Sequence, residues 1–202
     1  MFDVIIIGGG VSGMSSALVL GSAKNKPFVI DKKIGIITHQ KTSSLQEALI
    51  NNAFGITPGK LGSDLLVESI KHLSEMYPHI TQIHSEKVLK IEGESPKFTI
   101  TTNKNTYKSK SIIVGIGAAN TFAIEGLMQY VEPHKKIPFE KQRIQLKNID
   151  HKVAEGIYVT GTLAGWRSQV AIAAGSGAAV ATDILTLWNG GIQTQSHDSI
   201  KK

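Results

Sequence analysis

The sequence predicts an α/β fold in which a parallel central sheet carries helices on one side and a small antiparallel β-meander on the other. Three observations lead to this prediction. An apolar run at residues 2–7 passes through glycines into a segment of helical period. Short strands with polar turns follow between residues 80 and 109. A second apolar strand, at 156–160, ends in glycine and precedes a long alanine-rich helix.

Length and composition fit an ordinary globular protein. With 202 residues, we expect one domain over 1–190, the meander inserted at 80–109, and a polar tail over 191–202. The absence of cysteine excludes disulfides, thiolate metal sites and a redox dithiol. The N-terminus lacks the charged start of a signal peptide and we find no apolar run near 20 residues, so we expect a cytoplasmic protein without a membrane partner.

The formal charge of +6 comes from lysines spread along the chain. They form no dense basic run interleaved with aromatic residues, so we expect no nucleic-acid partner. The histidines show no spacing typical of metal ligands, and no Ser/His/Asp constellation supports hydrolase chemistry. We therefore expect no metal site.

The elements follow in order from the pattern of apolar residues. Residues 2–7 predict a buried strand, Val11 to about residue 24 a helix, and 27–31 a second buried strand, which together make one βαβ unit. Residues 34–58 look irregular, with a short helix near 44–50. The pattern then predicts helices at 62–77, 122–130 and 169–188, and strands at 80–84, 88–92, 97–102, 106–108, 111–116, 144–146 and 156–160.

The loop Gly8-x-Gly10-x-x-Gly13 lies between the first strand and the first helix. In this order the first glycine permits a tight turn and the second lets the backbone approach a pyrophosphate. The third lets helix and strand pack closely, while the helix N-terminus offers free N–H groups. Asp31, at the end of the predicted second strand, is placed to accept hydrogen bonds from a ribose. This combination predicts a Rossmann-like dinucleotide site.

The C-terminal part separates the possible cofactors. The strand GIYVTG at 156–161 is followed by TLAGWRSQ and then by the helix SQVAIAAGSGAAVA. Together with VIIIGGGVSG, Asp31, the meander and VGIGA at 114–118, these segments resemble the FAD-binding domain of thioredoxin reductase-like flavoproteins, in the pyridine nucleotide-disulfide oxidoreductase superfamily. The resemblance covers nearly the whole chain and implies a Rossmann-like FAD-binding domain.

The resemblance also implies roles for particular residues. Gly161 would approach the ribityl and phosphate groups, Gln169 and the Val170 backbone the pyrimidine edge of the flavin, and the Val88 backbone the adenine. The family has an acid after its last glycine, where this chain has Thr162, and Ala-Thr-Gly where it has Gly115-Ile116-Gly117. The predicted cofactor-binding residues are Gly8, Gly10, Val11, Ser12, Gly13, Asp31, Lys32, Val88, Gly115, Gly117, Gly161, Thr162, Gln169 and Val170.

Two absences shape the predicted activity. The full-length relatives carry an NADPH-binding domain between the two glycine strands, where this chain has about 38 residues and no second GxGxxG. The dithiol that reduces thioredoxin is missing. The resemblance therefore implies a small FAD-dependent oxidoreductase that is reduced by external NAD(P)H or a redox partner protein, and not a thioredoxin reductase.

Two other hypotheses stay open beside it. The chain could be a non-catalytic or partner-dependent flavin-binding module, or, more weakly, bind RNA like FAD-domain relatives in RNA modification. The alanine-rich last helix and Trp188 suggest a homodimer. The sequence identifies no substrate or catalytic residue; candidates on loops near the expected ring position, each with a surface or packing role as its alternative, are Thr38, His39, Gln40, Asn51, Asn52, Trp166 and Arg167.

Overall fold

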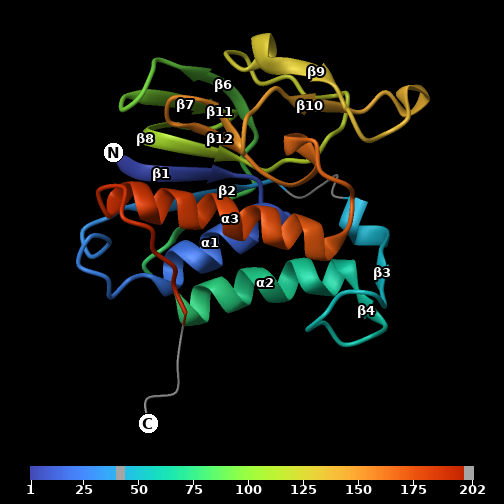
Figure 1. Cartoon of the computed structure of the whole chain (residues 1–202), viewed down its shortest axis with the longest axis horizontal. Coiled ribbons are helices and arrows are strands. Elements are labelled where there is room, and N and C mark those ends of the chain that lie inside the picture. The colour runs from blue at the N-terminus through green and yellow to red at the C-terminus, as the bar shows by residue number, and fades with distance from the viewer. Residues whose placement is uncertain (40–43, 198–202) are drawn as a thin grey trace.

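The fold is built on an eight-stranded, mainly parallel sheet (Figure 1). A computed structural model describes residues 1–39 and 44–197. The strand order is β11-β12-β8-β1-β2-β5, and β6 and β7 extend the sheet from β8. In this order the strands span Lys152–Ala154, Ile157–Val159, Thr106–Val114, Phe2–Ile7, Ile34–Thr38 and Thr81–His84, with β6 at Val88–Glu92 and β7 at Phe98–Thr102. The predicted mixed α/β fold is confirmed.

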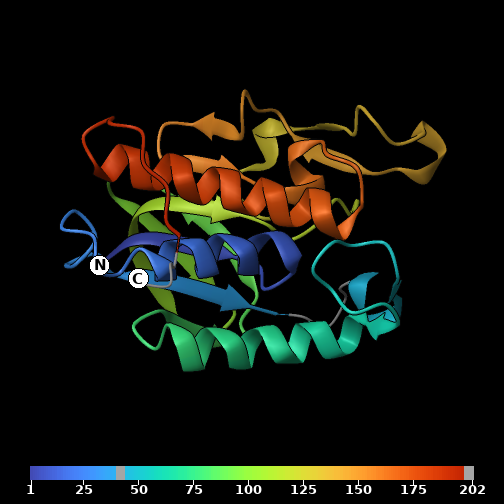
Figure 2. The same cartoon turned by 60° about the horizontal axis from the view of Figure 1, so that its bottom comes forward.

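Three helices cover one face of the sheet (Figure 2). They are α1 (Val11–Ser22), α2 (Gly62–Met76) and α3 (Val170–Trp188). Their apolar faces close one core against the sheet, with buried members that include Leu20 of α1, Leu73 of α2 and Ile184 of α3. The helices predicted at 62–77 and 169–188 agree with the bounds of α2 and α3 to within one residue.

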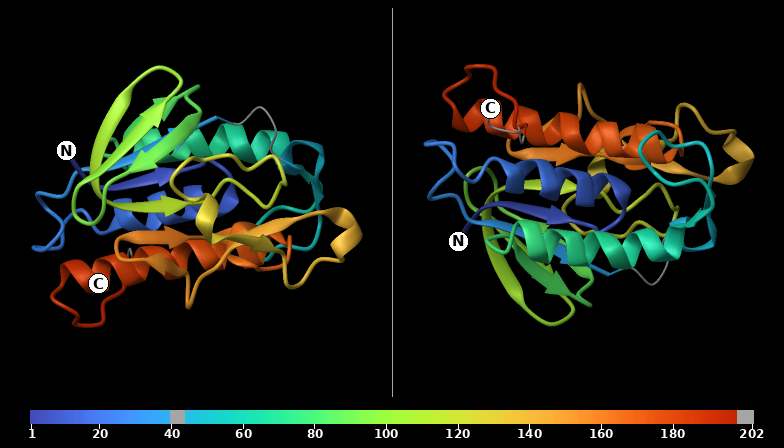
Figure 3. Two further views of the ribbon diagram at one scale, coloured as in Figure 1. Left: turned by 90° about the horizontal axis from the view of Figure 1, so that it is seen from above. Right: turned by 90° about the horizontal axis from the view of Figure 1, so that it is seen from below.

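The other face is covered by the meander and by the segment that links β8 to β12 (Figure 3). That segment contains the antiparallel pair β9 (Val131–Pro133) and β10 (Ile144–Leu146). A second core forms here around Phe98, Leu127 and Leu146. The remaining short elements are the pair β3 (Leu49–Ile50) and β4 (Lys60–Leu61) and the 3-10 turns at Ser44–Glu47, Met128–Tyr130, Phe139–Lys141 and Gly161–Ala164.

The segments 106–108 and 111–116, predicted as two strands, form the single strand β8. Its first half pairs antiparallel with β7, from Thr101↔Thr106 to Phe98↔Ser109. Its second half pairs parallel with β1 and β12. Of the two polar residues between the predicted strands, Lys110 is exposed, whereas Ser109 is buried and its hydroxyl donates to Ser111 O at 2.6 Å. The strand therefore continues through them, as the alternation of its first half gives way to the continuous burial of a central strand.

The predicted strand over 27–31 is wrong. Residues 27–31 form turns in which Val29 N–H bonds to Lys26 and Lys32 N–H bonds to Val29. The true second strand is β2, buried along its whole length. The sequence pattern missed this strand because Gly35 interrupts its apolar run. A Cβ on Gly35 would lie 2.9 Å from the ring of Phe2, so a small residue is needed where this ring packs.

The predicted helix over 122–130 is also wrong. The segment runs beside β6, where Ile91 N–H donates to Glu125 and Glu125 N–H donates to Leu89. Gly126 has a φ of 90°, and a Cβ there would overlap the carbonyl of Ile91. Phe122, Ile124 and Leu127 are buried in the second core, a spacing that an extended segment satisfies as well as a helix does.

The expectation that no apolar run comes near 20 residues is wrong, because α3, with 19 residues, is long and apolar enough to cross a membrane by length and composition. One of its faces is packed in the fold, with Gly177, Val180, Ala181, Ile184 and Leu185 buried. That face contacts α1 and the sheet, as a core helix of a globular domain does.

Candidate dinucleotide-binding site

The carboxyl ends of three neighbouring strands bring the glycines together. Gly115 N–H donates to Ile7 O at 2.8 Å, and Thr160 N–H donates to Val114 O at 2.9 Å. The loops that leave β1, β8 and β12 therefore start side by side at one edge of the sheet. In open α/β sheets, ligands bind at this edge.

The three glycines of the first loop have different reasons to be glycine. Gly8 has a φ of 113°, and a Cβ there would lie 2.5 Å from Gly115 O. A Cβ on Gly13 would overlap the carbonyl of Gly8. Gly10 has an ordinary φ of −74°, and a Cβ there would meet nothing within 4 Å. The fold itself requires Gly8 and Gly13, whereas Gly10 leaves open space above the backbone.

The N-terminus of α1 faces this space. Met14 N–H is the first to donate within the helix, to Gly10 O at 2.9 Å, so the N–H groups of Val11, Ser12 and Gly13 precede the helical hydrogen bonds. The first turn contains no acidic residue, and Gly10 has no side chain to cap it. Such a terminus binds anions through its N–H groups and its dipole.

Helix α3 packs closely along α1 at the same edge. Ser15 Oγ donates to Ala174 O and Ser16 Oγ donates to Gly177 O, each at 2.8 Å. A Cβ on Gly177 would overlap the carbonyl of Ser12. The small residues of the C-terminal segment thus let the second helix lie against the glycine loop.

The turn after β12 lies against Ser12 as well. Gly161 has a φ of 71°, and a Cβ there would lie 2.7 Å from Ser12 Oγ. The turn Gly161–Ala164 leads to Gln169, which is exposed and precedes α3. Ala173 N–H donates to Gln169 O at 2.9 Å, so α3, like α1, begins with N–H groups ahead of its first helical bond and with no acid in its first turn.

A hydrogen-bonded cluster around Ser176, which no local sequence pattern indicates, supports this turn. Ser176 Oγ accepts Gly161 N–H at 2.8 Å and lies 3.0 Å from Thr160 Oγ1 and 2.9 Å from His151 Nε2. Trp166 Nε1 donates to the same His151 nitrogen at 3.1 Å. The only signal in the sequence was the serine within an apolar helix, which has to find a partner.

The pKa of His151 is lowered by burial, against the opposing effect of Asp183 and Asp150. Burial raises the pKa of Asp183 in turn, with His151 acting in the other direction. Asp150 and His151 both adopt positive φ, 45° and 69°, which is uncommon for residues with a Cβ. The backbone is therefore held in a constrained turn that points this histidine at Ser176.

A second support comes from the segment between β8 and β12. His134 is buried and its Nε2 lies 3.0 Å from Thr162 O. Gln145, also buried, accepts Lys135 N–H at 3.0 Å and donates to Glu132 at 2.7 Å. A Cβ on Gly165 would lie 2.6 Å from Gln145 Oε1. These side chains fix the turn that carries Thr162.

The structure places the predicted cofactor residues in two groups. Gly8, Gly10, Val11, Ser12, Gly13, Gly115 and Gly161 come together at the carboxyl edge, and Gly117, Thr162, Gln169 and Val170 follow on the loops that leave it. Val88 begins β6 and is buried, opposite Thr102. Whether these residues contact a cofactor stays a prediction.

The placement of Asp31 and Lys32 needs correction. Both precede β2, so they lie at its amino end, because β2 runs parallel to β1 from Ile34 to Thr38. Lys32 Nζ lies 3.9 Å from Asp3 and 5.5 Å from the centre of the Trp188 ring. The ribose position of this fold is at the carboxyl end, which Thr38 and His39 occupy instead.

The loop candidates are dispersed. His39 is exposed at the end of β2, and Trp166 and Arg167 are exposed between the Gly161–Ala164 turn and α3. Asn51 Oδ1 accepts Gly59 N–H at 2.8 Å and so closes the β3–β4 loop, which also contains the exposed Asn52. Gln40 lies outside the described residues. Trp188 packs against the helix-side core, which accounts for it without a second chain.

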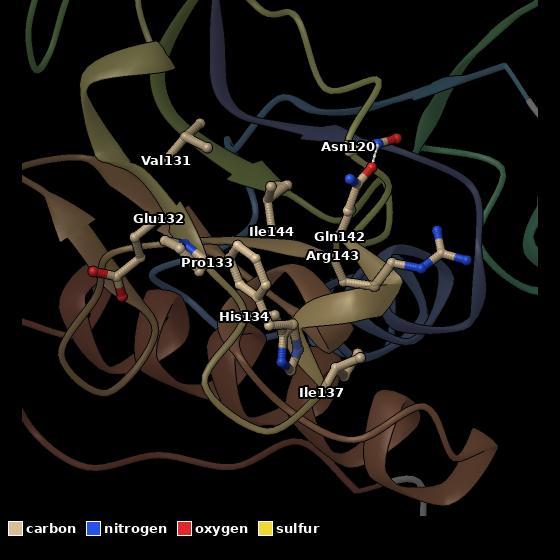
Figure 4. A pocket seen from close by; sticks show the side chains of 10 residues that line it. Asn120, Val131, Glu132, Pro133, His134, Ile137, Gln142, Arg143 and Ile144 are labelled. Atoms are coloured by element: carbon tan, nitrogen blue, oxygen red, sulfur yellow. Dashed lines mark hydrogen bonds between the residues drawn. The ribbon is translucent and has the colours of Figure 1, made fainter.

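A hollow of about 400 Å³ opens beside β9 and β10 (Figure 4). Val131, Pro133, Ile144 and Phe139 give it a mainly apolar lining, and Asn120 and Gln142 bond across its rim at 3.4 Å. Its lining residues come from the segment between β8 and β12, which is distant in sequence from the glycine loop. Among the described residues, no group of three His, Asp or Glu side chains is arranged to hold a metal ion.

The strand, glycine loop and helix at the carboxyl edge define a dinucleotide-binding domain of the Rossmann type. The chain belongs to the pyridine nucleotide-disulphide oxidoreductase family, whose profile matches residues 2–177.

Known proteins agree with this assignment. A ferredoxin–NADP reductase of Leuconostoc mesenteroides is 28% identical over 192 residues, which cover 94% of this chain and 50% of the relative. One from Streptococcus mutans is 31% identical over 117 residues, 58% of this chain and 34% of the relative. The chain thus spans about half the length, or less, of the curated relatives it matches.

Solved structures share the fold at low sequence identity. An oxidoreductase from Agrobacterium tumefaciens superposes with a TM-score of 0.72 at 15% identity, covering 92% of this chain and 98% of that chain. A ferredoxin-flavin thioredoxin reductase from Clostridium acetobutylicum gives 0.67 at 18% identity, covering 93% and 98%. The Rossmann-like architecture is therefore that of thioredoxin reductase-like proteins.

Proposed function

We propose that this chain binds FAD at the glycine loop and acts as a small oxidoreductase that is reduced by an external donor. Gly10 is the observation that carries the proposal. Neither its backbone angles nor its neighbours require a glycine, and it sits where a pyrophosphate would approach the N-terminus of α1. A ligand that comes close to the backbone accounts for a residue that the fold alone does not require.

The phosphate end fits an anion without further positive side chains. The N–H groups of Val11 and Ser12 point out of the first turn of α1, and no acid in that turn opposes a negative ligand. Ser12 itself is buried against Gly161, so its side chain supports the loop and its backbone N–H remains the group directed at the ligand.

The start of α3, together with the turn that carries Thr162, fits a flavin. Bound there, the isoalloxazine would supply the two-electron chemistry, and the protein supplies position and electrostatics. The start of α3, at Gln169 and Val170, offers N–H groups and a positive dipole end for negative charge on the ring. Thr162 stands where relatives have an acid, so its hydroxyl and backbone would orient the ribityl chain without adding a charge.

An external electron donor follows from the segment between β8 and β12. In this chain the segment is occupied by β9, β10 and the turns that brace Thr162, and it holds no second glycine-rich nucleotide loop. Relatives named ferredoxin–NADP reductases support NAD(P)H or a small redox protein as the donor class. With no cysteine in the chain, electrons must leave the flavin directly to the acceptor.

A partner-dependent flavin module is the second candidate. It is favoured by the match to only about half of the curated relatives' length and by the apolar hollow beside β9 and β10. In that case FAD binds, but NAD(P)H alone does not reduce it at a useful rate.

The test is to purify the protein, identify any bound cofactor by absorbance and mass, and mix it anaerobically with NADH or NADPH. A yellow protein that bleaches with either donor supports the oxidoreductase. A yellow protein that bleaches only with dithionite, or only after a cell fraction is added, supports the module. A protein that binds no FAD, even after incubation with an excess, contradicts both.

A further inference from the structure

A second hollow, of about 430 Å³, lies at the carboxyl ends of β2 and β5. It is next to the glycine loop in the sheet, because Gly8 N–H donates to Ile37 O at 2.9 Å, one residue before the end of β2. The described residues that line it are Thr38, His39, Ile70, His84, Ser85, Asn103 and Lys104. The size suits a nucleoside phosphate rather than a single ion.

The described lining of this hollow lacks the carboxylate of a usual FAD or NAD site. In this fold a carboxylate at the carboxyl end of the second strand holds the ribose hydroxyls, and a cation there takes a 2′-phosphate. Here the strand ends at Thr38 and His39, and the sequence contains no acid from residue 38 until Glu47. The described lining presents two histidines and a lysine and no carboxylate.

Neighbouring hydrogen bonds hold the polar groups in place. His84 Nδ1 lies 3.1 Å from Thr38 Oγ1, which orients the ring at the end of the sheet. Asn103 Oδ1 accepts Lys87 N–H at 2.8 Å, and this leaves the Asn103 amide NH₂ as the donor end of the side chain. Donors on two strands and on the meander turn therefore surround one space.

The acid that follows the lining residue Ser85 in the sequence is Glu86, which bonds to the turn that carries Lys104. It is buried and accepts hydrogen bonds from Thr102 at 2.6 Å, Asn105 at 2.7 Å and Tyr107 at 3.0 Å. These donors hold the pKa of Glu86 below its ordinary value, despite burial, and Lys104 adds to the effect. Because its oxygens are engaged inside the turn, Glu86 does not replace the missing ribose carboxylate.

We propose that the glycine loop of this chain also binds 2′-phosphorylated adenine nucleotides, the NADP(H) class, in competition with FAD. The pyrophosphate would lie at the N-terminus of α1 and the 2′-phosphate among His39, His84 and Lys104. The inference rests on the proposed function, since it uses the same loop. It adds a selectivity: NADP(H) binds more tightly than NAD(H), and a high NADP(H) concentration opposes FAD loading.

The experiment compares 2′,5′-ADP with 5′-ADP on the protein freed of flavin, by calorimetry at low ionic strength. These probes differ by one phosphate at the ribose 2′ position. We expect 2′,5′-ADP to bind at least about tenfold more tightly, as charge-assisted hydrogen bonds to a phosphate would give, and the difference to shrink as salt rises. Excess FAD should displace the bound 2′,5′-ADP.

Two substitutions locate the effect, His39→Gln and Lys104→Gln. Both side chains are exposed, so the fold should be retained, which circular dichroism checks. Each should lower the ratio of the two affinities several-fold, and Lys104→Gln should leave 5′-ADP binding nearly unchanged. Lys108→Gln is the matched control, because it is an exposed lysine on the adjacent strand β8 that does not line the hollow.

The outcomes separate this inference from the proposed function. Equal binding of the two probes by a protein that takes up FAD overturns the inference and leaves the flavin proposal standing. A ratio that survives both substitutions, or a bound 2′,5′-ADP that FAD does not displace, also overturns it. A protein that binds neither FAD nor either probe overturns both.

Discussion

The indole Nε1 of Trp166 donates a hydrogen bond to Nε2 of His151 over 3.1 Å, and the two rings stack at 25° with their centres 6.1 Å apart. Lys136 Nζ lies 4.1 Å from the centre of the Trp166 ring. Because an indole N–H can only donate, His151 Nε2 must be an unprotonated acceptor. The contact therefore requires a neutral His151, in agreement with the direction in which burial moves its pKa.

The first prediction concerns acid pH. The pKa of His151 is lowered in the folded protein, so the unfolded chain binds more protons below its ordinary value of 6.5. The stability that the neutral ring contributes is present above that pH and is lost as the pH falls through the folded pKa. Urea unfolding followed between about pH 7.5 and 5.5 should show a larger loss for the wild type than for His151→Gln.

The same titration has an optical readout. Protonation of His151 breaks the bond from Trp166, so the tryptophan emission should change over the pH range in which stability falls. His79 has a pKa lowered in the same direction, by burial and then by Lys24, but it is present in both proteins and cancels in the comparison. Identical pH profiles for wild type and His151→Gln would contradict the assignment.

The second prediction separates the two kinds of glycine in the first loop. Gly10→Ala should fold with a midpoint close to wild type, because its φ is −74° and nothing lies within 4 Å of the added Cβ. It should lose most of its FAD, because the methyl group occupies the path of the pyrophosphate. Thermal melts and the flavin content of the purified protein measure the two effects.

Gly13→Ala is the counterpart. Its Cβ would overlap the carbonyl of Gly8, so strand and helix must move apart, and we expect a loss of about 1–3 kcal/mol or more in unfolding free energy. If Gly10→Ala kept its full flavin content, the loop would not be the phosphate site.

The third prediction concerns Ser176. Replacing it with alanine leaves the buried Gly161 N–H without its acceptor, which should cost roughly 1–3 kcal/mol of stability. The turn that carries Thr162 should also loosen, so FAD should dissociate faster. Ser168→Ala is the control, since Ser168 is exposed just before α3. Chemical unfolding and the rate of flavin release should both distinguish the two variants.

The fourth prediction concerns Glu86. The pKa of this carboxyl is lowered, chiefly by the hydrogen bond from Thr102, against the effect of burial. Its charged form contributes stability that is present above the ordinary value of 4.5 and lost as the pH falls through the folded pKa. Glu86→Gln should be less stable than wild type near neutral pH and similar to it in strong acid. An unchanged difference between the two proteins across the acid range would contradict this.

Elements with a long, regular apolar pattern could be predicted from the sequence. Elements whose residues are explained by contacts with distant parts of the chain could not. The first strand, α1, α2, α3 and the meander followed from apolar period and turn residues. Strand β2 was missed because Gly35 interrupts its apolar run, and its role depends on Phe2, a distant residue in the sequence. The extended segment around Ile124 was missed because its partners lie in β6.

The residues of the candidate site likewise fall into those that a local pattern predicts and those that depend on distant partners. The glycine loop is a local signal, and Gly8, Gly10 and Gly13 lie where it places them. Asp31 was misplaced together with its strand, and this error hid the fact that β2 ends at Thr38 and His39, without a carboxylate. The partners of Ser176 are His151 and the adjacent pair Thr160 and Gly161, which lie in two other segments, so no local pattern could reveal the cluster.

The neighbouring positions of β8 and β12 allow this fold to be extended. The chain leaves the sheet at Val114 and returns to the adjacent strand, where Ile157 pairs with Ile112. Between them the β9–β10 hairpin ends in an exposed turn at Phe139–Lys141. A domain inserted into that turn would have its two ends close together. The pairing of β8 with β12, and the glycine-containing loops that follow these strands, would stay unchanged. That turn is therefore the place at which a nicotinamide-binding module can be fused to test the proposed flavin reduction within one chain.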